Sequence, residues 1–119
     1  MRDFRSLQVW AKAHQLALNV YAATASFHAS EQYGLTSQLR RAVTCIASNI
    51  AEGCGRQTEA ELGRFCHVAM GSASEVEYQL LLARDVGFLA EADYVRLNAS
   101  VIEVKRMLTA FILKLTADS

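Results

Sequence analysis

Seven apolar residues near the end of the chain are separated by strictly alternating steps of three and four positions: Tyr94, Leu97, Val101, Val104, Leu108, Phe111 and Leu115. This spacing has a period of about 3.5 residues, which places all seven side chains along one side of an α-helix. The 119-residue chain has no proline and 19 alanines. Because proline breaks helices and alanine favours them, the whole chain is predicted to be helical.

Three other stretches show a helical period, and the four predicted helices cover residues 7–26, 37–52, 59–86 and 92–116. The signals expected at their ends are Ser6 as an N-cap, Gly53 and Gly55 as a helix stop, a capping box from Thr58 to Glu61, and Gly87 as a second stop. Four amphipathic helices with short connections predict a single-domain, antiparallel up-down-up-down four-helix bundle.

The charges of the chain cancel, because twelve basic residues balance twelve acidic ones. Zero net charge does not favour bulk nucleic acid or an anionic membrane as the dominant partner. No apolar run reaches the roughly 18 residues of a membrane-spanning helix, and the first residues lack the pattern of a signal peptide. We therefore expect a cytoplasmic protein whose three cysteines stay reduced.

Two adjacent arginines, Arg40 and Arg41, are the leading candidates for a functional contact. Neighbouring residues of a helix point about 100° apart, so the two side chains cannot have the same role. Arginine outnumbers lysine nine to three, which favours fixed bidentate partners such as carboxylates and phosphates. Together with Arg56, these residues are predicted to make either ion pairs, within or between subunits, or contacts with an anion such as nucleic acid.

A second set of polar residues lies at helical spacing on two helices: Asn49, Glu52, Glu75 and Gln79. A polar network between the helices that carry them would fix helix register. A catalytic pair of carboxylates is the alternative, although no nucleophile or second base is spaced to work with it. A di-iron centre needs Glu-x-x-His motifs, and no glutamate here has a histidine three residues later.

The cysteines and histidines do not follow a metal-binding pattern. Cys54, Cys66 and His67 fit no zinc-site spacing, so no metal or other cofactor is expected. Cys54 lies between two glycines and is expected to be exposed and prone to oxidation. Gly53 and Gly55 lack the preceding strand and the Gly-Lys-Ser/Thr sequence of a phosphate-binding loop.

Two helices carry more apolar residues than one core-facing side requires. Residues 80–82 are three leucines, and residues 111–113 are Phe-Ile-Leu; each run spans about 200° of its helix. The excess would form an exposed apolar surface unless another subunit covers it. An oligomer interface is therefore predicted at Leu81, Leu82, Ile112 and Leu113; a position at the edges of the bundle is the alternative.

Motifs distributed over the whole chain point to one family. The first group is Leu7-x-Val9-Trp10-x-Lys12-Ala13 and Tyr33-Gly34-Leu35-x-x-Gln38-Leu39-Arg40-Arg41-Ala42. The second group is Asn49-Ile50-Ala51-Glu52-Gly53-x-Gly55-Arg56, Arg64-Phe65, Ala69-x-Gly71-Ser72 and Glu75-x-Glu77-x-Gln79-Leu80. In these motifs the chain resembles the small four-helix bundle proteins of the 23S rRNA intervening-sequence type.

The resemblance implies a four-helix bundle that assembles as a ring-shaped homopentamer. It also implies a relation to accessory proteins of diversity-generating retroelements, which partner a reverse transcriptase and bind nucleic acid through strongly basic surfaces. This chain differs from those accessory proteins in being neutral. The first hypothesis is thus a non-enzymatic, cytoplasmic homo-oligomer, with no small-molecule substrate, and the alternative is a nucleic-acid-binding accessory factor with an arginine-lined surface.

Overall fold

The computed structural model describes residues 1–117, which form four α-helices, two short 3-10 helices and no strand. The α-helices are α1 (Gln8–Thr24), α2 (Leu35–Cys54), α3 (Glu59–Asp85) and α4 (Glu91–Ala117), and the 3-10 helices are η1 (Phe4–Ser6) and η2 (Ala29–Glu31). The all-helical prediction is confirmed. The observed bounds of the α-helices differ from the predicted ones by at most two residues.

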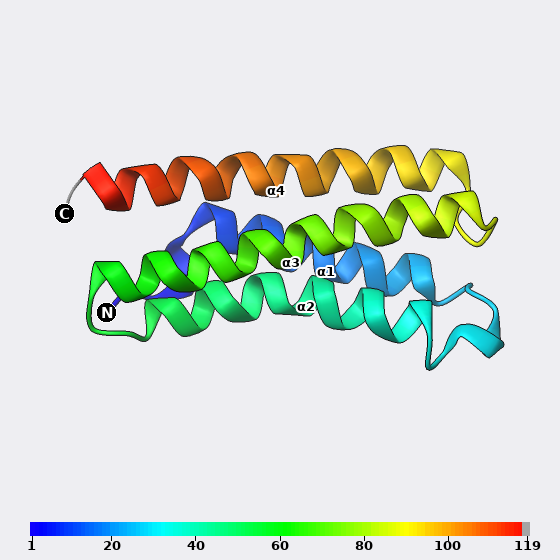
Figure 1. Cartoon of the computed structure of the whole chain (residues 1–119), viewed down its shortest axis with the longest axis horizontal. Helices are drawn as coiled ribbons and strands as arrows, with labels where there is room; N and C mark the ends of the chain where they lie inside the picture. The colour runs from blue at the N-terminus through cyan, green and yellow to red at the C-terminus, as the bar shows by residue number, and fades with distance from the viewer. Residues whose placement is uncertain (118–119) are drawn as a thin grey trace.

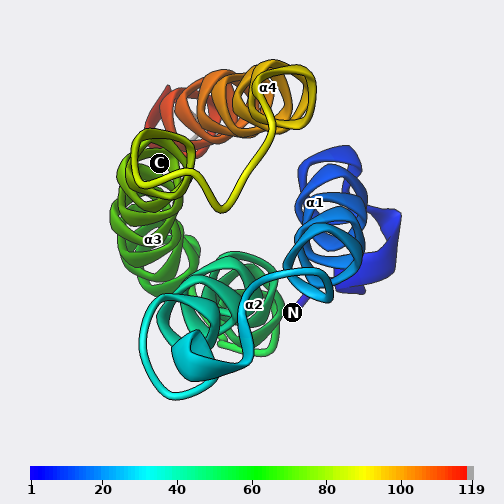
Figure 2. The ribbon, with the colours of Figure 1, turned by 90° about the vertical axis from the view of Figure 1, so that its right-hand side faces the viewer.

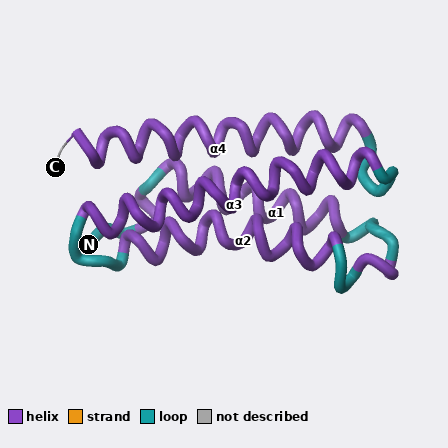
Figure 3. The backbone as a smooth tube through the Cα atoms, in the orientation of Figure 1, coloured by secondary structure: helices purple, strands orange, loops and turns teal. Residues whose placement is uncertain are grey.

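The four α-helices form an elongated bundle that measures 46 × 23 × 20 Å (Figure 1). Successive helices run in opposite directions, and their connections lie at the two ends of the bundle (Figure 3). Each helix packs on its neighbours in the chain, and α1 also packs on α4. Viewed along the bundle, α1 and α3 therefore lie on opposite sides, with α2 and α4 between them (Figure 2).

The core is apolar and follows the predicted spacing. In α4, five of the seven apolar residues at alternating spacing are buried: Leu97, Val101, Val104, Leu108 and Leu115. The other two, Tyr94 and Phe111, are half-buried and pack against the core. They belong to one core cluster with leucine, isoleucine, valine and alanine side chains of the other three helices. The alternating spacing thus identifies the packed side of α4 correctly.

Two of the predicted helix ends are confirmed. The Thr58 hydroxyl oxygen accepts a hydrogen bond of 3.1 Å from the Glu61 amide, as expected of the residue that caps α3. Gly87 has a φ angle of 88°, in the left-handed region that favours glycine. It directly follows Val86, the C-cap of α3, and so ends this helix as predicted.

Of the other two predicted ends, the Ser6 cap is wrong, and the glycine stop is confirmed in position but not in conformation. Ser6 belongs to η1, and Leu7 precedes α1 without a side-chain cap. Gly55 is the C-cap of α2, as predicted of the stop, whereas Gly53 lies inside the helix. Gly55 has a φ angle of −80°, so neither glycine adopts the left-handed conformation. The reason for Gly53 is steric. A Cβ atom there would lie 2.9 Å from both the Leu62 Cδ1 and the Phe65 Cβ atoms of α3.

The first residues of the chain join three helices at one end of the bundle. The Arg2 amide donates a hydrogen bond of 2.9 Å to the Cys54 carbonyl oxygen at the end of α2. The Arg2 guanidinium lies 2.8 Å from a carboxylate oxygen of Glu59, which begins α3. It also lies 5.7 Å from the ring centroid of Phe111 in α4. Arg2 thus closes this end of the bundle.

Candidate functional site

Arg40 is held by a neighbouring helix. Its Nε atom donates a hydrogen bond of 2.8 Å to the Thr24 hydroxyl, and its Nη2 atom donates one of 3.2 Å to the Tyr21 carbonyl oxygen. The guanidinium also lies 4.7 Å from the ring centroid of Tyr21. The last carbonyls of a helix have no partner inside it, so Arg40 caps the C-terminal end of α1. Its contacts are structural.

Arg41, by contrast, is exposed, and no other described residue forms an ion pair or hydrogen bond with its side chain. It lines a shallow hollow of about 410 Å³ beside the N-terminus of α2, together with Tyr21, Gln32, Tyr33, Thr36, Ser37 and Arg40. Tyr33 is 90% exposed. A helix N-terminus carries partial positive charge, so this hollow combines a free guanidinium with a positive dipole and an accessible aromatic ring.

Arg56 belongs to the opposite end of the bundle. It follows α2, whose 20 residues span about 30 Å. Its guanidinium lies 3.1 Å from a Glu52 carboxylate oxygen and 4.9 Å from the ring centroid of Phe65. The structure therefore does not bring Arg56 together with Arg40 and Arg41 in one chain.

The polar residues Asn49, Glu75 and Gln79 bond within their own helices. Asn49 donates to the Cys45 carbonyl oxygen at 2.7 Å, and the Gln79 amide donates to a Glu75 carboxylate oxygen at 3.3 Å. Among residues 1–117, no hydrogen bond or ion pair joins these side chains of α2 to those of α3. The Gln79 side chain is buried, and its Oε1 atom has no partner in the described chain.

The apolar residues that were assigned to an oligomer interface differ in exposure. Leu113 is 64% exposed, whereas Leu82 and Ile112 are half-buried and pack against the core. Leu81 is also half-buried. Other exposed apolar residues had not been singled out from the sequence: Leu18, Tyr21, Val68, Tyr78 and Val95. For α1 the sequence does indicate an exposed apolar surface, because charged residues are nearly absent from that helix.

The expectation that Cys54 is exposed is wrong. Cys54 and Cys66 are both buried in the core, at 1% and 0% exposure. Burial raises the pKa of the Cys54 thiol, and it raises the pKa of Cys66 to about 11, because an apolar surrounding disfavours the thiolate. Both thiols are therefore protonated and poorly reactive at neutral pH.

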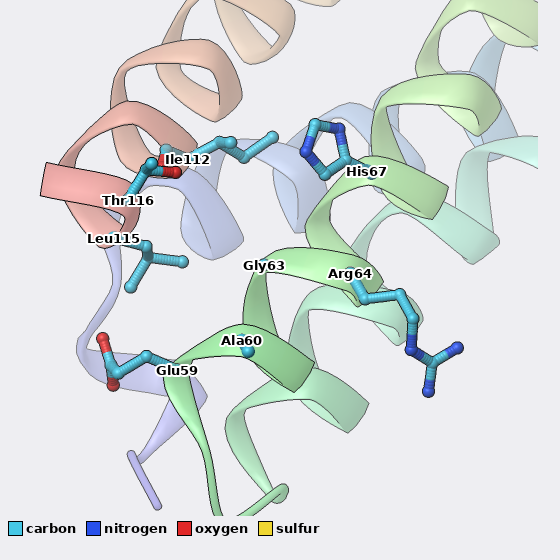
Figure 4. A pocket seen from close by; sticks show the side chains of 8 residues that line it. All are labelled: Glu59, Ala60, Gly63, Arg64, His67, Ile112, Leu115 and Thr116. Carbon is cyan, nitrogen blue, oxygen red and sulfur yellow. The ribbon is translucent and has the colours of Figure 1, made fainter. Parts of the chain in front are cut away.

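A hollow of about 430 Å³ lies between the start of α3 and the end of α4. We call it the α3/α4 hollow, and it is lined by Glu59, Ala60, Gly63, Arg64, His67, Ile112, Leu115 and Thr116. Ile112 and His67 reach toward each other across it, whereas Arg64 points away (Figure 4). The Arg64 guanidinium lies over the Phe65 ring, 4.7 Å from its centroid. Four of the eight lining residues, Ala60, Gly63, Ile112 and Leu115, are therefore small or apolar, and the other four are polar or charged.

Residues 1–117 contain no group of three or more histidine, cysteine, aspartate or glutamate side chains arranged to hold a metal ion. Within the same residues, no helix is both long and apolar enough to span a membrane. What the fold and its surface define is a small antiparallel four-helix bundle that carries apolar side chains and a free arginine, Arg41, on its outside.

Comparison with known proteins then identifies the family. The chain belongs to the 23S rRNA-intervening sequence protein family, whose model matches residues 5–110. It is also similar to a crystal structure of a protein of unknown function from the S23 ribosomal protein family of Bacteroides thetaiotaomicron, with a TM-score of 0.80 and 23% sequence identity. The similarity covers 87% of this chain and 94% of that one, and at this identity it shows the shared fold. No curated protein matched the chain.

Proposed function

We propose that the protein is a non-enzymatic, cytoplasmic assembly protein that acts as a homo-oligomer, with five subunits as in the ring-shaped relatives it resembles. The observation that carries the proposal is the apolar surface left outside a core that is already closed. Leu18, Val68, Val95 and Leu113 are each about half or more exposed, and they come from three of the four helices. Covering such residues with another subunit removes apolar area from water and so stabilises an assembly.

The proposal assigns no reaction to the chain. The raised pKa values of Cys54 and Cys66 come from burial in the core, where the thiols cannot reach a substrate. Two of the carboxylates discussed above, Glu52 and Glu59, form ion pairs near the surface with Arg56 and Arg2. Exposed pairs of this kind are common on protein surfaces and contribute about 0–1 kcal/mol each to stability.

Native mass spectrometry of protein purified from its own host, without nuclease treatment, tests the proposal. The expected result is an ion of five times the 13.1 kDa chain mass, which contains protein only. A bare monomer at micromolar concentration would contradict the assembly. A fivefold mass with additional heterogeneous mass that nuclease removes would instead favour the second candidate function.

That second candidate is a nucleic-acid-binding accessory factor, and the free guanidinium of Arg41 beside Tyr33 is the observation that favours it. Exposed aromatic rings can stack on unpaired bases, and arginine contacts the phosphate backbone. A ring of subunits would repeat this hollow around its axis and so concentrate positive charge locally in an otherwise neutral protein.

For the second candidate, Arg41→Ala is expected to weaken binding to single-stranded oligonucleotides and to lower the slope of log Kd against log salt by about one for each phosphate that Arg41 neutralises. Arg41 is the better target of the two adjacent arginines, since Arg40→Ala would also remove the cap of α1. Arg106→Ala removes an exposed arginine from α4 and is the matched control. Binding that is absent, independent of salt or equally affected by both substitutions would exclude this candidate.

A further inference from the structure

His28 holds the connection between α1 and α2. Its Nδ1 atom accepts a hydrogen bond of 3.1 Å from the Ser30 amide and so caps η2. Because a ring nitrogen that accepts a hydrogen bond carries no proton, the imidazole is neutral in this arrangement. The Ser30 hydroxyl lies 2.8 Å from the same nitrogen and can donate to it as well. One unprotonated nitrogen therefore fixes both hydrogen-bond donors of Ser30.

Glu31, the last residue of η2, connects this turn to the start of α2. Its amide donates a hydrogen bond of 2.9 Å to the His28 carbonyl oxygen, and its Oε1 atom accepts one of 3.2 Å from the Leu35 amide. The N-cap of α2 is Gly34, which has no side chain to satisfy the first amides of the helix, so Glu31 takes this role. Gly34 also leaves room for the carboxylate, since a Cβ atom there would lie 2.9 Å from Oε1.

Few other contacts hold η2 in place. Of the helices that the structure describes, only α2 packs against it. It is a single turn of three residues, none of which is buried, and short 3-10 turns have poor hydrogen-bond geometry. The order of this turn therefore depends strongly on the bonds to the His28 ring, which is exposed and can take a proton from water.

Within residues 1–117, the neighbouring charged groups offer no replacement for these bonds once the ring is protonated. Glu31 is the only charged residue of η2, and its carboxylate is engaged by the Leu35 amide. The first charged residues of α2 are two arginines, which have the same sign as a protonated histidine. At the same end of the bundle, Arg84 of α3 pairs with Asp85 and Glu91 (Figure 1).

We propose that His28 is a pH-sensitive switch for the start of α2: when its ring gains a proton, η2 opens and Glu31 leaves the Leu35 amide. A protonated Nδ1 atom would direct its own hydrogen at the Ser30 N–H group, so the capping bond must break, whereas the Ser30 hydroxyl can rotate and accept. Histidine changes its charge between about pH 5 and pH 8, so the turn is closed above this range and open below it.

The switch also affects the hollow beside Arg41. Gln32 and Tyr33 follow η2 directly and line this hollow, so opening of η2 moves part of its border. Departure of the Glu31 carboxylate also leaves the partial positive charge of the α2 N-terminus uncompensated. The switch itself does not require that the hollow binds nucleic acid.

A pH titration of the whole protein, followed by NMR between about pH 8 and pH 5, tests the switch. TROSY spectra of perdeuterated, ¹⁵N-labelled protein suit a single chain and an oligomer alike. The Ser30 amide proton is expected to move upfield as the His28 ring titrates, and the Leu35 amide is expected to shift with the same midpoint. In His28→Asn, whose Oδ1 atom can accept from Ser30 throughout this range, both resonances are expected to stay in place. His14→Gln and His67→Gln remove the other two histidines and are expected to respond like the wild type.

Three results would overturn the switch. A Ser30 amide that stays in place while the His28 ring titrates would show that the ring does not hold it. A shift at Ser30 without one at Leu35 would show that the turn opens without uncapping α2. A response that His28→Asn retains would assign the titration to another group. Glu31→Gln, which keeps an acceptor for the Leu35 amide, then shows whether that group is the Glu31 carboxylate.

Discussion

Replacement of Gly53 by valine is expected to lower the free energy of unfolding by about 3 kcal/mol, at the upper end of the usual cost of overpacking. The Cβ position lies 2.9 Å from the Phe65 Cβ atom and 3.3 Å from the Leu62 carbonyl oxygen. Neither atom can move without the backbone of α3, so α2 and α3 must separate. Urea denaturation followed by circular dichroism measures the decrease in stability.

A second variant, Gly53→Ala, makes a smaller change at the same position, and Gly71→Ala provides its control. Gly71 lies in the middle of α3, and a Cβ atom there would meet nothing within 4 Å. Alanine is favoured over glycine inside a helix, so Gly71→Ala should stabilise the protein by about 0.5–1 kcal/mol. Gly53→Ala should instead destabilise it by about 1 kcal/mol, because the clash exceeds the gain in helix propensity. Equal stabilisation by both substitutions would show that the helices are not as close as described.

Leu108→Ala is expected to lower the free energy of unfolding by about 2–5 kcal/mol, an effect of similar or larger size than that of Gly53→Val. Leu108 is fully buried in the row of spaced apolar residues of α4, and its truncation leaves a cavity that a helix packed on two neighbours cannot close. Small domains are stable by only about 5–15 kcal/mol, so this variant should unfold at a clearly lower urea concentration or temperature.

Leu113→Ala is the matched control on the same helix. Leu113 is 64% exposed, so its truncation should change the unfolding free energy of a single chain by no more than about 0.5 kcal/mol. If Leu113 lies in a subunit interface, the effect should instead depend on protein concentration. A large effect that does not depend on concentration would contradict the exposure described for this residue.

The sequence predicted features of the fold that depend on local spacing. The alternating repeat in α4, the capping box at Thr58 and the stop at Gly87 are each defined by a few neighbouring residues, and all three are confirmed. Two of the differences, at Gly53 and Cys54, depend on residues outside α2. The space at Gly53 is limited by Leu62 and Phe65 of α3, and Cys54 is buried in the packed bundle, which no pattern inside α2 could reveal.

The candidate site was harder to predict for a related reason. The sequence showed that Arg40 and Arg41 must point in different directions, but it could not tell which one is free. Thr24 and the Tyr21 carbonyl hold Arg40, and these groups come from another helix. For Asn49 and Gln79, suitable spacing predicted a network between helices, whereas the side chains bond within their own helices. Spacing gives the side of a helix that a residue occupies, and the partner is chosen by packing.

The contacts of Arg2 have a consequence for the order of folding. Its partners are Cys54, Glu59 and Phe111, so the last of these contacts joins residues that are 109 positions apart in the chain (111 − 2). Closing so long a loop costs conformational entropy that must be spent before the contact itself contributes. We expect this end of the bundle to close only after the helices that carry these partners have packed, so that the second residue is among the last to reach its final position.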